Sequence, residues 1–570
     1  MQPTKFFGLG GMQEIGKSTL VIEHNDKIFI LDAGIKFGNG SITGIKGIIP
    51  NYKYLKANQH KIEGLFLTHG HEDHMGGIPY LLQQIDLKFI YAPRIAIKYL
   101  EAKISERKLQ TNVKFIEIEK DEKFVFDDVA VDFWTAQHSI PDAFGIRFST
   151  PNGSLMFTGD FRFDYTPIGN MTDFKKLEQM GDENLTVLFS DSTNAMRPAH
   201  SPSEKDILKD IKSYMEKAEK KIIITAFASN MTRISAIIKM AAELGKKVVT
   251  FGRSMVNGVN IGREIGYIDV DASVFIDKKN ISKFDENEIV ILTTGSQGEQ
   301  LAALAKMAIG KHPQVVVKNR DLIIFSSSPI PGNRIKIELL INNLYKLGAD
   351  IKENRVDGYL HTSGHAYREE HDKIFQLTKP DYFVPYHGEY RMSVVHGQTA
   401  VENGVKPENV FIAAHGEVYE LLDRKLTLSE NRIDVAPVYI DGDIASELNS
   451  KIIKEREVLG ESGFVHVVVT INRARNEIVG RTKIISRGTL YVKTSLPIIT
   501  ESRRLVHGAL LYKIKNHDNW TTQQLKKLIQ ERLQPYFYKT KRRKPIITST
   551  IFYIDDLRLI SPPEEEIIAN

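Results

Sequence analysis

A compact group of metal-ligand side chains lies early in the chain. The segment Thr68–His74 has the sequence Thr-His-Gly-His-Glu-Asp-His and directly follows the apolar residues Gly64–Leu67, which are typical of a buried strand. A loop at a strand end can direct its first two histidines to one point, and its aspartate and last histidine to a second point nearby. Two such points are the arrangement of a two-metal hydrolytic site. The four side chains are His69, His71, Asp73 and His74.

The chain contains no cysteine, which excludes disulfides, thiolate metal sites and cysteine nucleophiles. Any metal must be held by histidine and carboxylate, and sites with such ligands usually keep open positions for chemistry. Three more candidate ligands follow apolar runs. Taken singly, each is more often a structural or turn residue, but together with the His-x-His-x-Asp-His segment they favour a metal site. They are Asp32, His138 and Asp160.

The alternation of strands and helices changes along the chain. Short strands and turns dominate the first part, regular strand–helix alternation follows and predicts a parallel sheet, and a strand-and-turn pattern then returns. Two strands, two helices and a final strand are expected at the end. Within this pattern, helices are expected near Met75–Gln84 and Glu299–Met307. The expected boundaries are 1–202 and 354–426 for a split first domain, 203–353 for an inserted domain, 427–450 for a linker and 451–570 for a last domain.

The composition is that of an ordinary soluble globular protein, with 42% hydrophobic and 26% charged residues in a chain of 570. No apolar run approaches the roughly 20 residues that a membrane span needs, and the N-terminal residues lack the pattern of a signal peptide. We therefore expect a cytoplasmic protein with no membrane partner.

Positive charge is concentrated near the C-terminus. Residues 501–550 contain twelve basic and three acidic side chains, whereas the whole chain has a net charge of only +5. Such a stretch forms either a solvated basic face or a surface that binds phosphate groups.

Further motifs carry a resemblance to a known family. The order of Asp32, the His69–His74 segment, His138 and Asp160 resembles the metallo-β-lactamase fold. The inserted parallel-sheet block resembles the β-CASP subgroup, which acts on nucleic acids. The motif residues of that subgroup match Asp191 in Phe-Ser-Asp-Ser-Thr, His365 in His-Thr-Ser-Gly-His-Ala, and His387 in Pro-Tyr-His-Gly-Glu. A histidine at the last of these motifs favours RNA over DNA.

The resemblance extends over nearly the whole chain to the ribonuclease J family. It includes Phe227–Asn230, Phe251–Met255, Thr294–Glu299 and the late basic run Lys541–Pro545. It implies an α/β protein in which a metallo-β-lactamase αββα sandwich is interrupted by a β-CASP parallel-sheet domain and followed by a small α+β C-terminal domain.

The resemblance also implies a set of metal ligands. His69, His71 and His138 would hold one Zn²⁺, and Asp73, His74 and His387 would hold a second, with Asp160 bridging the two. Mn²⁺ is an alternative, because histidine and carboxylate ligands accept both ions. Asp32 would orient the site without being a ligand.

The catalytic roles follow from the same resemblance. His365 would protonate the leaving oxygen or stabilise charge on the phosphoryl group, and Asp191 would fix the tautomer of His365. A pocket for a terminal 5′-phosphate is expected among two segments. Ser229 and Asn230 also suit the N-terminal cap of a helix, and the two roles are compatible. The expected pocket residues are Ser229, Asn230, Met231, His361, Thr362, Ser363, Gly364 and His365.

We therefore expect a two-zinc ribonuclease with 5′→3′ exonuclease activity that favours 5′-monophosphate RNA, and with endonuclease activity, acting in mRNA decay and rRNA maturation. The expected partners are single-stranded RNA and other subunits, in a homodimer, a homotetramer or a hetero-oligomer with a paralogue. Three alternatives remain. They are a weakly active paralogue that binds RNA in a complex, a β-CASP DNA nuclease, and a thioester or lactam hydrolase on the same fold.

One departure from the family pattern concerns a structural calcium ion. Lys46 and Asn51 stand where related chains carry acidic residues. Their presence argues against a calcium site, with Asp441 and Asp443 as the remaining candidate ligands.

Overall fold

The computed structural model describes residues 2–37, 44–299, 301–330, 333–442, 444–446, 450–491, 495–516 and 519–554. The chain divides into two compact units, residues 1–37 with 46–445, and residues 38–45 with 446–570. No helix among the described residues is long and apolar enough to cross a membrane.

Two sheets stack against each other in the first unit. The eight-stranded sheet has the order β21-β20-β1-β2-β3-β6-β7-β8, and the six-stranded sheet has the order β19-β13-β12-β11-β10-β9. The strands of the first are β1 (Thr4–Gly10), β2 (Thr19–His24), β3 (Lys27–Leu31), β6 (Ile62–Phe66), β7 (Phe89–Ala92), β8 (Lys114–Glu117), β20 (Glu417–Leu422) and β21 (Lys425–Arg432). Those of the second are β9 (Lys123–Phe126), β10 (Val129–Ala136), β11 (Ala143–Thr150), β12 (Gly153–Phe157), β13 (Val187–Asp191) and β19 (Tyr382–Tyr386).

Strand β3 shows why the sheets stack. Phe29 and Leu31 point into the core between the two sheets, where Phe29 lies 5.7 Å from Phe148 of β11 between ring centroids. Ile28 and Ile30 point the other way, into a core formed with the outer helices. A strand that is apolar on both faces must be covered on both, which gives the αββα order of layers.

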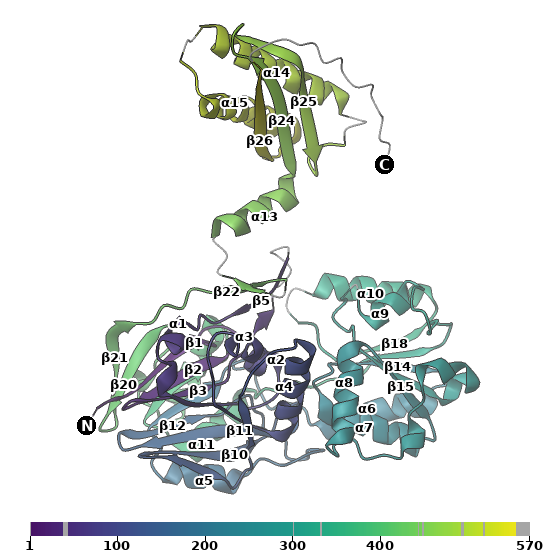
Figure 1. Ribbon diagram of the computed structural model, residues 1–570. Coiled ribbons are helices and arrows are strands. Elements are labelled where there is room, and N and C mark those ends of the chain that lie inside the picture. Colours follow the sequence, from purple (N-terminus) through teal and green to yellow (C-terminus); the bar gives the residue numbers. More distant parts are fainter. Residues whose placement is uncertain are drawn as a thin grey trace. The chain divides into compact units, whose positions relative to one another are not determined.

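Helices cover the outer face of each sheet. Helices α1 (Lys53–Ala57), α3 (Ile78–Leu81) and α4 (Arg94–Glu106) share a core with the first sheet. Helices α5 (Phe174–Asp182), α11 (Arg368–Thr378) and α12 (Tyr390–Glu402) share a core with the second, and α5 lies beyond β10, β11 and β12 in Figure 1. Helix α2 (Glu72–Met75) follows β6, and 3-10 helices occupy Gln59–Lys61, Ala272–Val274, Lys278–Lys283, Glu286–Glu288 and Pro407–Asn409.

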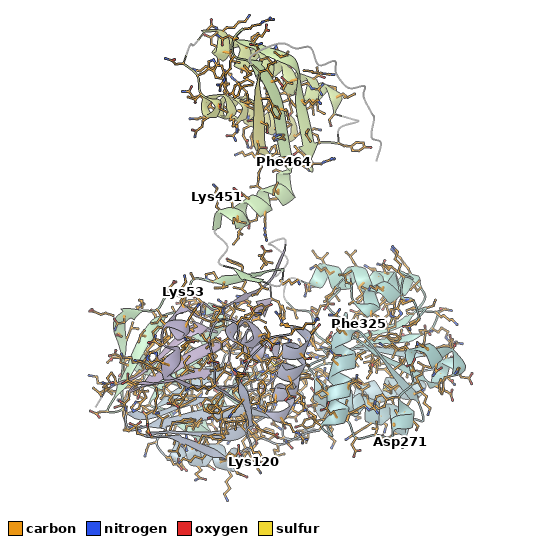
Figure 2. All side chains as sticks on the ribbon, in the orientation of Figure 1. Lys53, Lys120, Asp271, Phe325, Lys451 and Phe464 are labelled. Carbon is orange, nitrogen blue, oxygen red and sulfur yellow. The ribbon has the colours of Figure 1, made fainter. Side chains whose placement is uncertain are left out.

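The inserted block is a five-stranded parallel sheet in the order β15-β16-β14-β17-β18, drawn in teal in Figure 1. Helices α6 to α8 pack on one face and α9 and α10 on the other. Phe325 belongs to the core, whereas Asp271 lies at the outer edge of the block (Figure 2). The elements are α6 (Glu204–Lys217), β14 (Ile222–Thr225), α7 (Met231–Glu243), β15 (Lys247–Phe251), α8 (Arg253–Glu264), β16 (Ile289–Thr293), α9 (Ala303–Ala308), β17 (Leu322–Phe325), α10 (Arg334–Lys346) and β18 (Asp350–Glu353).

A small sheet and a connecting strand complete the first unit. Strand β4 (Lys36–Phe37) pairs with β5 (Ile45–Ile49), and β22 (Val438–Asp441) lies next to β5. Strand β23 (Ile444–Ser446) carries the chain across the boundary between the units.

The second unit has a three-stranded sheet in the order β25-β24-β26, with two helices packed on one face. Its elements are α13 (Ser450–Ser462), β24 (Phe464–Asn472), β25 (Glu477–Arg487), α14 (Leu496–Asn516), α15 (Thr522–Lys541) and β26 (Ile546–Ile554). The expected fold class, with its αββα sandwich, inserted parallel sheet and small α+β unit, is confirmed.

Three local expectations are wrong. In place of the helix expected over Met75–Gln84, α2 ends at Met75 and α3 spans Ile78–Leu81, with Gly76 and Gly77, two residues of low helix propensity, between them. The helix expected over Glu299–Met307 begins only at Ala303. The part after Asn354, expected to contain strands and turns, also contains α11 and α12, which cover the second sheet.

Substitution of Gly145 tests the packing of the second sheet. Gly145 pairs with Trp134 across β10 and β11, and a Cβ atom would lie 2.1 Å from the indole ring. We expect Gly145→Ala to lower the free energy of unfolding by about 1–3 kcal/mol, as overpacking does, measured by urea denaturation. Gly169→Ala, where the nearest atom is 3.8 Å away, is the control. Equal stability of the two variants would contradict this packing.

Candidate active site

The candidate ligands come from strand ends of both sheets. The His69–His74 loop follows β6, His138 follows β10, and Asp160 follows β12. Strands β12, β13 and β19 are parallel neighbours, so Asp160, Asp191 and His387 meet at one edge of the second sheet. The carboxyl ends of parallel strands are a common place for ligand sites.

A first group of ligand atoms surrounds one carboxylate oxygen of Asp160. The ligand atoms of His69, His71, His138 and Asp160 all lie within 4.8 Å of one another. Nε2 of His69 and Nε2 of His138 each lie 3.7 Å from Oδ2 of Asp160. Nδ1 of His71 lies 2.9 Å from Nε2 of His138. The four side chains thus face a common point.

A second group surrounds the other oxygen of the same carboxylate. Asp73, His74, Asp160 and His387 form a set within the same limit. Nε2 of His74 lies 3.3 Å from Oδ1 of Asp160, and Nε2 of His387 lies 3.3 Å from Oδ2 of Asp73. Asp160 therefore belongs to both groups, as a bridging ligand would.

The facing atoms are buried without hydrogen-bond partners. They are Nε2 of His69, His74 and His387, and both carboxylate oxygens of Asp160. Unpaired buried polar atoms are costly and are rare in folded proteins. A donor set of imidazole and carboxylate with no other partner fits divalent cations such as Zn²⁺ or Mn²⁺.

The rear nitrogens of three of these rings are held by the protein. Nδ1 of His138 donates to the carbonyl oxygen of Gly364 at 2.7 Å, and Nδ1 of His74 lies 2.7 Å from Oδ2 of Asp32. Nδ1 of His69 lies 3.0 Å from Oγ1 of Thr68. A hydrogen bond at the rear nitrogen fixes the tautomer that leaves Nε2 free as a ligand.

Burial and charge set the protonation of the first group. Burial lowers the pKa of His71 to about 4 and that of His138 to about 3, and it holds the pKa of His69 well below its usual value. These three rings are therefore neutral, which is the form that binds a metal.

The carboxylates dominate the second group. Burial opposes their charge, but the neighbouring imidazoles outweigh burial and hold the pKa values of Asp73 and Asp160 below the usual range. At His387, the carboxylates of Asp160, Asp191 and Asp73 overcome burial and raise the pKa of the ring to about 10. At His74, Asp160 and Asp32 raise the pKa well above its usual value. The cluster thus contains buried negative charge that needs positive charge beside it.

Asp32 lies behind the ligands, as expected of an orienting residue. Its carboxylate accepts hydrogen bonds from the backbone N–H of Thr68 at 2.8 Å and from Oγ1 of Thr68. It also contacts Nδ1 of His74. Asp32 therefore ties the strand end to the ligand loop.

His365 and Asp191 form a pair beside the second group. Nδ1 of His365 lies 2.7 Å from Oδ2 of Asp191. Burial opposes the charged ring, but the carboxylates of Asp191 and Asp160 outweigh it and raise the pKa of His365. The backbone oxygen of Asp191 accepts a hydrogen bond from Nε2 of the buried His371 at 3.0 Å.

The segments of the expected phosphate pocket are joined by Arg233. Asn230 caps α7 by accepting a hydrogen bond from the N–H of Arg233, so the capping role is present. Arg233 also lies 2.6 Å from Nδ1 of His361. Burial and the charge of Arg233 hold the pKa of His361 well below its usual value. His361 is thus neutral with its proton on Nε2.

The other pocket residues have distinct environments. Met231 is buried in the core of the inserted block. Thr362 accepts a hydrogen bond from Arg162, and Oγ of Ser363 accepts one from Asn194 at 2.8 Å. Ser229 is half-buried at the end of the loop before α7.

Sequence reasoning missed a network of buried charges under the pocket. Arg162 pairs with Asp164 and donates to the carbonyl oxygens of Pro202 and Ser363. Arg233 pairs with Glu204. The carboxylate of Glu370 accepts hydrogen bonds from Phe163, Ser201 and Tyr367. One sequence feature indicates this network: the charged Arg162 lies between two aromatic residues, in Phe-Arg-Phe at 161–163.

The calcium expectation stays a prediction. Nδ2 of Asn51 lies 3.5 Å from Oδ2 of Asp434, and Asp441 ends β22. Asp443 lies outside the described residues.

Four family profiles match the chain. The description "Metallo-beta-lactamase superfamily" covers residues 13–199 and "Ribonuclease J, beta-CASP domain" covers 219–344. "Zn-dependent metallo-hydrolase RNA specificity domain" covers 349–413, and "Ribonuclease J C-terminal domain" covers 451–554.

Similar proteins match over nearly their full length. Ribonuclease J of Mycoplasma genitalium is 40% identical over 97% of this chain and 98% of its own. Ribonuclease J 1 of Streptococcus pyogenes is 38% identical over 96% and 97%, and Ribonuclease J2 of Bacillus subtilis is 32% identical over 96% and 98%. A solved structure of a protein of unknown function from Enterococcus faecalis covers 74% of this chain and all of its own, with a TM-score of 0.51 and 16% identity. That structure shares the fold.

Replacement of Asp160 tests the bridging arrangement. We expect Asp160→Asn to lower the divalent cation content of the protein, because both ligand groups lose the charge of the carboxylate that they share. Elemental analysis after dialysis measures the metal content. Asp86→Asn, a change at an exposed aspartate, should keep the full content. An unchanged metal content in Asp160→Asn would contradict the arrangement.

Proposed function

The chain belongs to the ribonuclease J family of metal-dependent ribonucleases, and from this membership we propose that it holds two zinc ions and degrades single-stranded RNA. The proposed activities are 5′→3′ exonuclease activity that favours a 5′-monophosphate, and endonuclease activity, in mRNA decay and rRNA maturation. The observation that carries the proposal is the pair of buried ligand groups that share Asp160, with the Asp191–His365 pair beside them.

The proposed ligands divide between the two oxygens of Asp160. His69, His71 and His138 would hold one cation, and Asp73, His74 and His387 the other. When bound, two divalent cations lower the pKa of water towards about 7 and thus supply hydroxide for attack on a phosphodiester phosphorus. The protein contributes the neutral imidazoles of His69, His71 and His138, the carboxylates that face His74 and His387, and a buried site that excludes bulk water.

His365 is proposed to act on the leaving group. Its Nδ1 is held by Asp191, which leaves Nε2 to face a substrate. In this role Nε2 gives its proton to the 3′-oxygen as the bond from phosphorus to that oxygen breaks, or stabilises charge on the phosphoryl oxygens. Asp191 keeps the ring oriented and supports its positive charge.

The phosphate pocket is proposed to select the 5′ end. Ser229, Asn230 and the segment His361–His365 offer hydroxyls, backbone amides and the Nε2 proton of His361. Such groups bind a terminal phosphate without contacting a base edge, so they select an end and not a sequence.

The proposal includes the organisation of the whole protein. The boundaries at 202, 353, 426 and 450 are proposed as the domain limits, and a homodimer, a homotetramer or a hetero-oligomer with a paralogue as the assembly. With mRNA and rRNA as substrates, the proposed place of action is the cytoplasm.

A panel of substrates tests the activity. We expect release of mononucleotides from 5′-monophosphate RNA, slower release from 5′-triphosphate and 5′-hydroxyl RNA, and loss of all cleavage after chelation. Thin-layer chromatography of end-labelled products gives the readout. Freshly metallated protein that cleaves no RNA would refute the enzyme, and equal cleavage of matched DNA would refute the preference for RNA.

A second test separates the roles of His365 and the ligands. We expect His365→Ala to lower kcat by about 10²–10⁴-fold, the usual contribution of a general acid, with the metal content unchanged. Asp191→Asn should reduce kcat less and shift its pH profile, because the carboxylate no longer supports the charged ring. A His365→Ala enzyme with normal kcat would exclude this role.

A further inference from the structure

Among the described residues, the helices packed on the C-terminal sheet, α14 and α15, cover only one of its faces. Along β24, Val465, Val467 and Val469 point into the core with α14 and α15 and are almost fully buried. The alternate residues Phe464, His466 and Val468 point to the opposite face and are only half-buried. The two faces of one strand thus have different surroundings, as expected when helices cover a single side.

The neighbouring strands extend this open face. Opposite Phe464, His466 and Val468, β25 carries Arg487, Ile485 and Lys483, all of which are exposed. On the other side, β26 places Phe552 next to Thr470, with 55% of Phe552 exposed. The open sheet face is defined by Phe464, His466, Val468, Thr470, Lys483, Ile485, Arg487 and Phe552.

Aromatic rings on this face are ordered. The rings of Phe464 and His466 lie 6.1 Å apart between centroids and 12° from parallel. Both nitrogens of His466 are within hydrogen-bond distance of hydroxyls on β26, 2.7 Å from Thr548 and 3.2 Å from Thr550. These bonds fix the ring, so a planar ligand meets a preformed surface.

The charged side chains of the open sheet face, Lys483 and Arg487, are both positive. The three strands contain a single carboxylate, Glu477, which lies at the end of β25 and 3.8 Å from Arg475. At the other end, Nη1 of Arg543 donates to the carbonyl oxygen of Gly488, directly after Arg487. The basic run Lys541–Lys544 therefore leads into β26 beside Phe464 and Arg487.

We propose that the open sheet face binds single-stranded RNA, with bases stacked on Phe464, His466 and Phe552 and with phosphates at Lys483, Arg487 and Arg543. Exposed aromatic rings on a sheet beside cations are the combination that binds single strands without sequence preference. The proposal rests on the proposed ribonuclease function, because it assigns to the C-terminal unit a second contact with the same substrate.

Paired substrates of different length test the proposal in the full-length metallated protein. One RNA has about 5 nucleotides, which is enough to fill a single contact. The other has about 30 nucleotides, because only a longer strand can occupy two separate contacts at once. We expect Phe552→Ala to raise KM for the long RNA about tenfold, the effect of one lost base stack. The kcat for both RNAs and the KM for the short RNA should stay as in the unchanged protein.

A charge variant gives an independent measurement. We expect the double variant Lys483→Gln/Arg487→Gln to raise KM for the long RNA. The slope of log KM against log salt concentration should fall by about 1.4, because two phosphate contacts to a single strand are lost. Two control variants change the helices and not the open sheet face. The double variant Lys526→Gln/Lys527→Gln removes the same charge from exposed positions of α15, and Tyr512→Ala removes an exposed ring of α14. Both controls should leave KM unchanged.

The outcomes are distinct. Unchanged KM for the long RNA in both face variants would overturn the RNA surface while leaving the ribonuclease standing. A face variant that sediments as a smaller assembly would show that a second copy of the chain occupies the face, which also overturns the proposal. If the short RNA is not cleaved by the unchanged protein, the proposed function fails. Anisotropy of a labelled long RNA then tests the face alone.

Discussion

The site depends on one buried carboxylate. Asp160 is 1% exposed, its two oxygens face different sets of imidazoles, and neither oxygen has a hydrogen-bond partner. An isolated charge in such a position would cost several kcal/mol. The imidazoles of His74 and His387, whose pKa values are raised, offset part of this cost. A bound cation would offset it further and would thus stabilise the folded protein.

A second level of structure holds the loops that surround this carboxylate. Glu370 joins the loop after Asp160, the segment near Ser201 and the start of α11, through hydrogen bonds to three backbone N–H groups. Arg162 and Arg233 continue the network towards the segment at His361. Arg162 and Arg233 are buried and pair with Asp164 and Glu204, and loss of one partner from such a pair typically costs about 3–5 kcal/mol. The ligand loops and the phosphate pocket are thus parts of one polar framework.

Much of the architecture could be predicted from local patterns. The regular alternation of strands and helices expected between residues 203 and 353 is present in the inserted block, because apolar periodicity reports burial directly. Helix α11 was missed, because its sequence is mostly polar and its apolar residues, such as Ile374 and Phe375, reveal a buried side only when the second sheet is present. The helix expected after His74 is interrupted at Gly76 and Gly77, because glycine has a low helix propensity that apolar periodicity does not take into account.

The sequence by itself determined the donor set: a histidine-rich loop after a strand, no cysteine, and carboxylates at other strand ends. Those features depend on residue type and neighbouring residues alone. Only the tertiary structure decided which of these ligand atoms lie close together and that Asp160 faces both groups. It also decided that Arg233 fixes which ring nitrogen of His361 carries the proton, and that the described helices leave one face of the C-terminal sheet uncovered. These features join residues up to hundreds of positions apart. The sheet pairings that bring them together arise from packing of the whole chain, which no local pattern records.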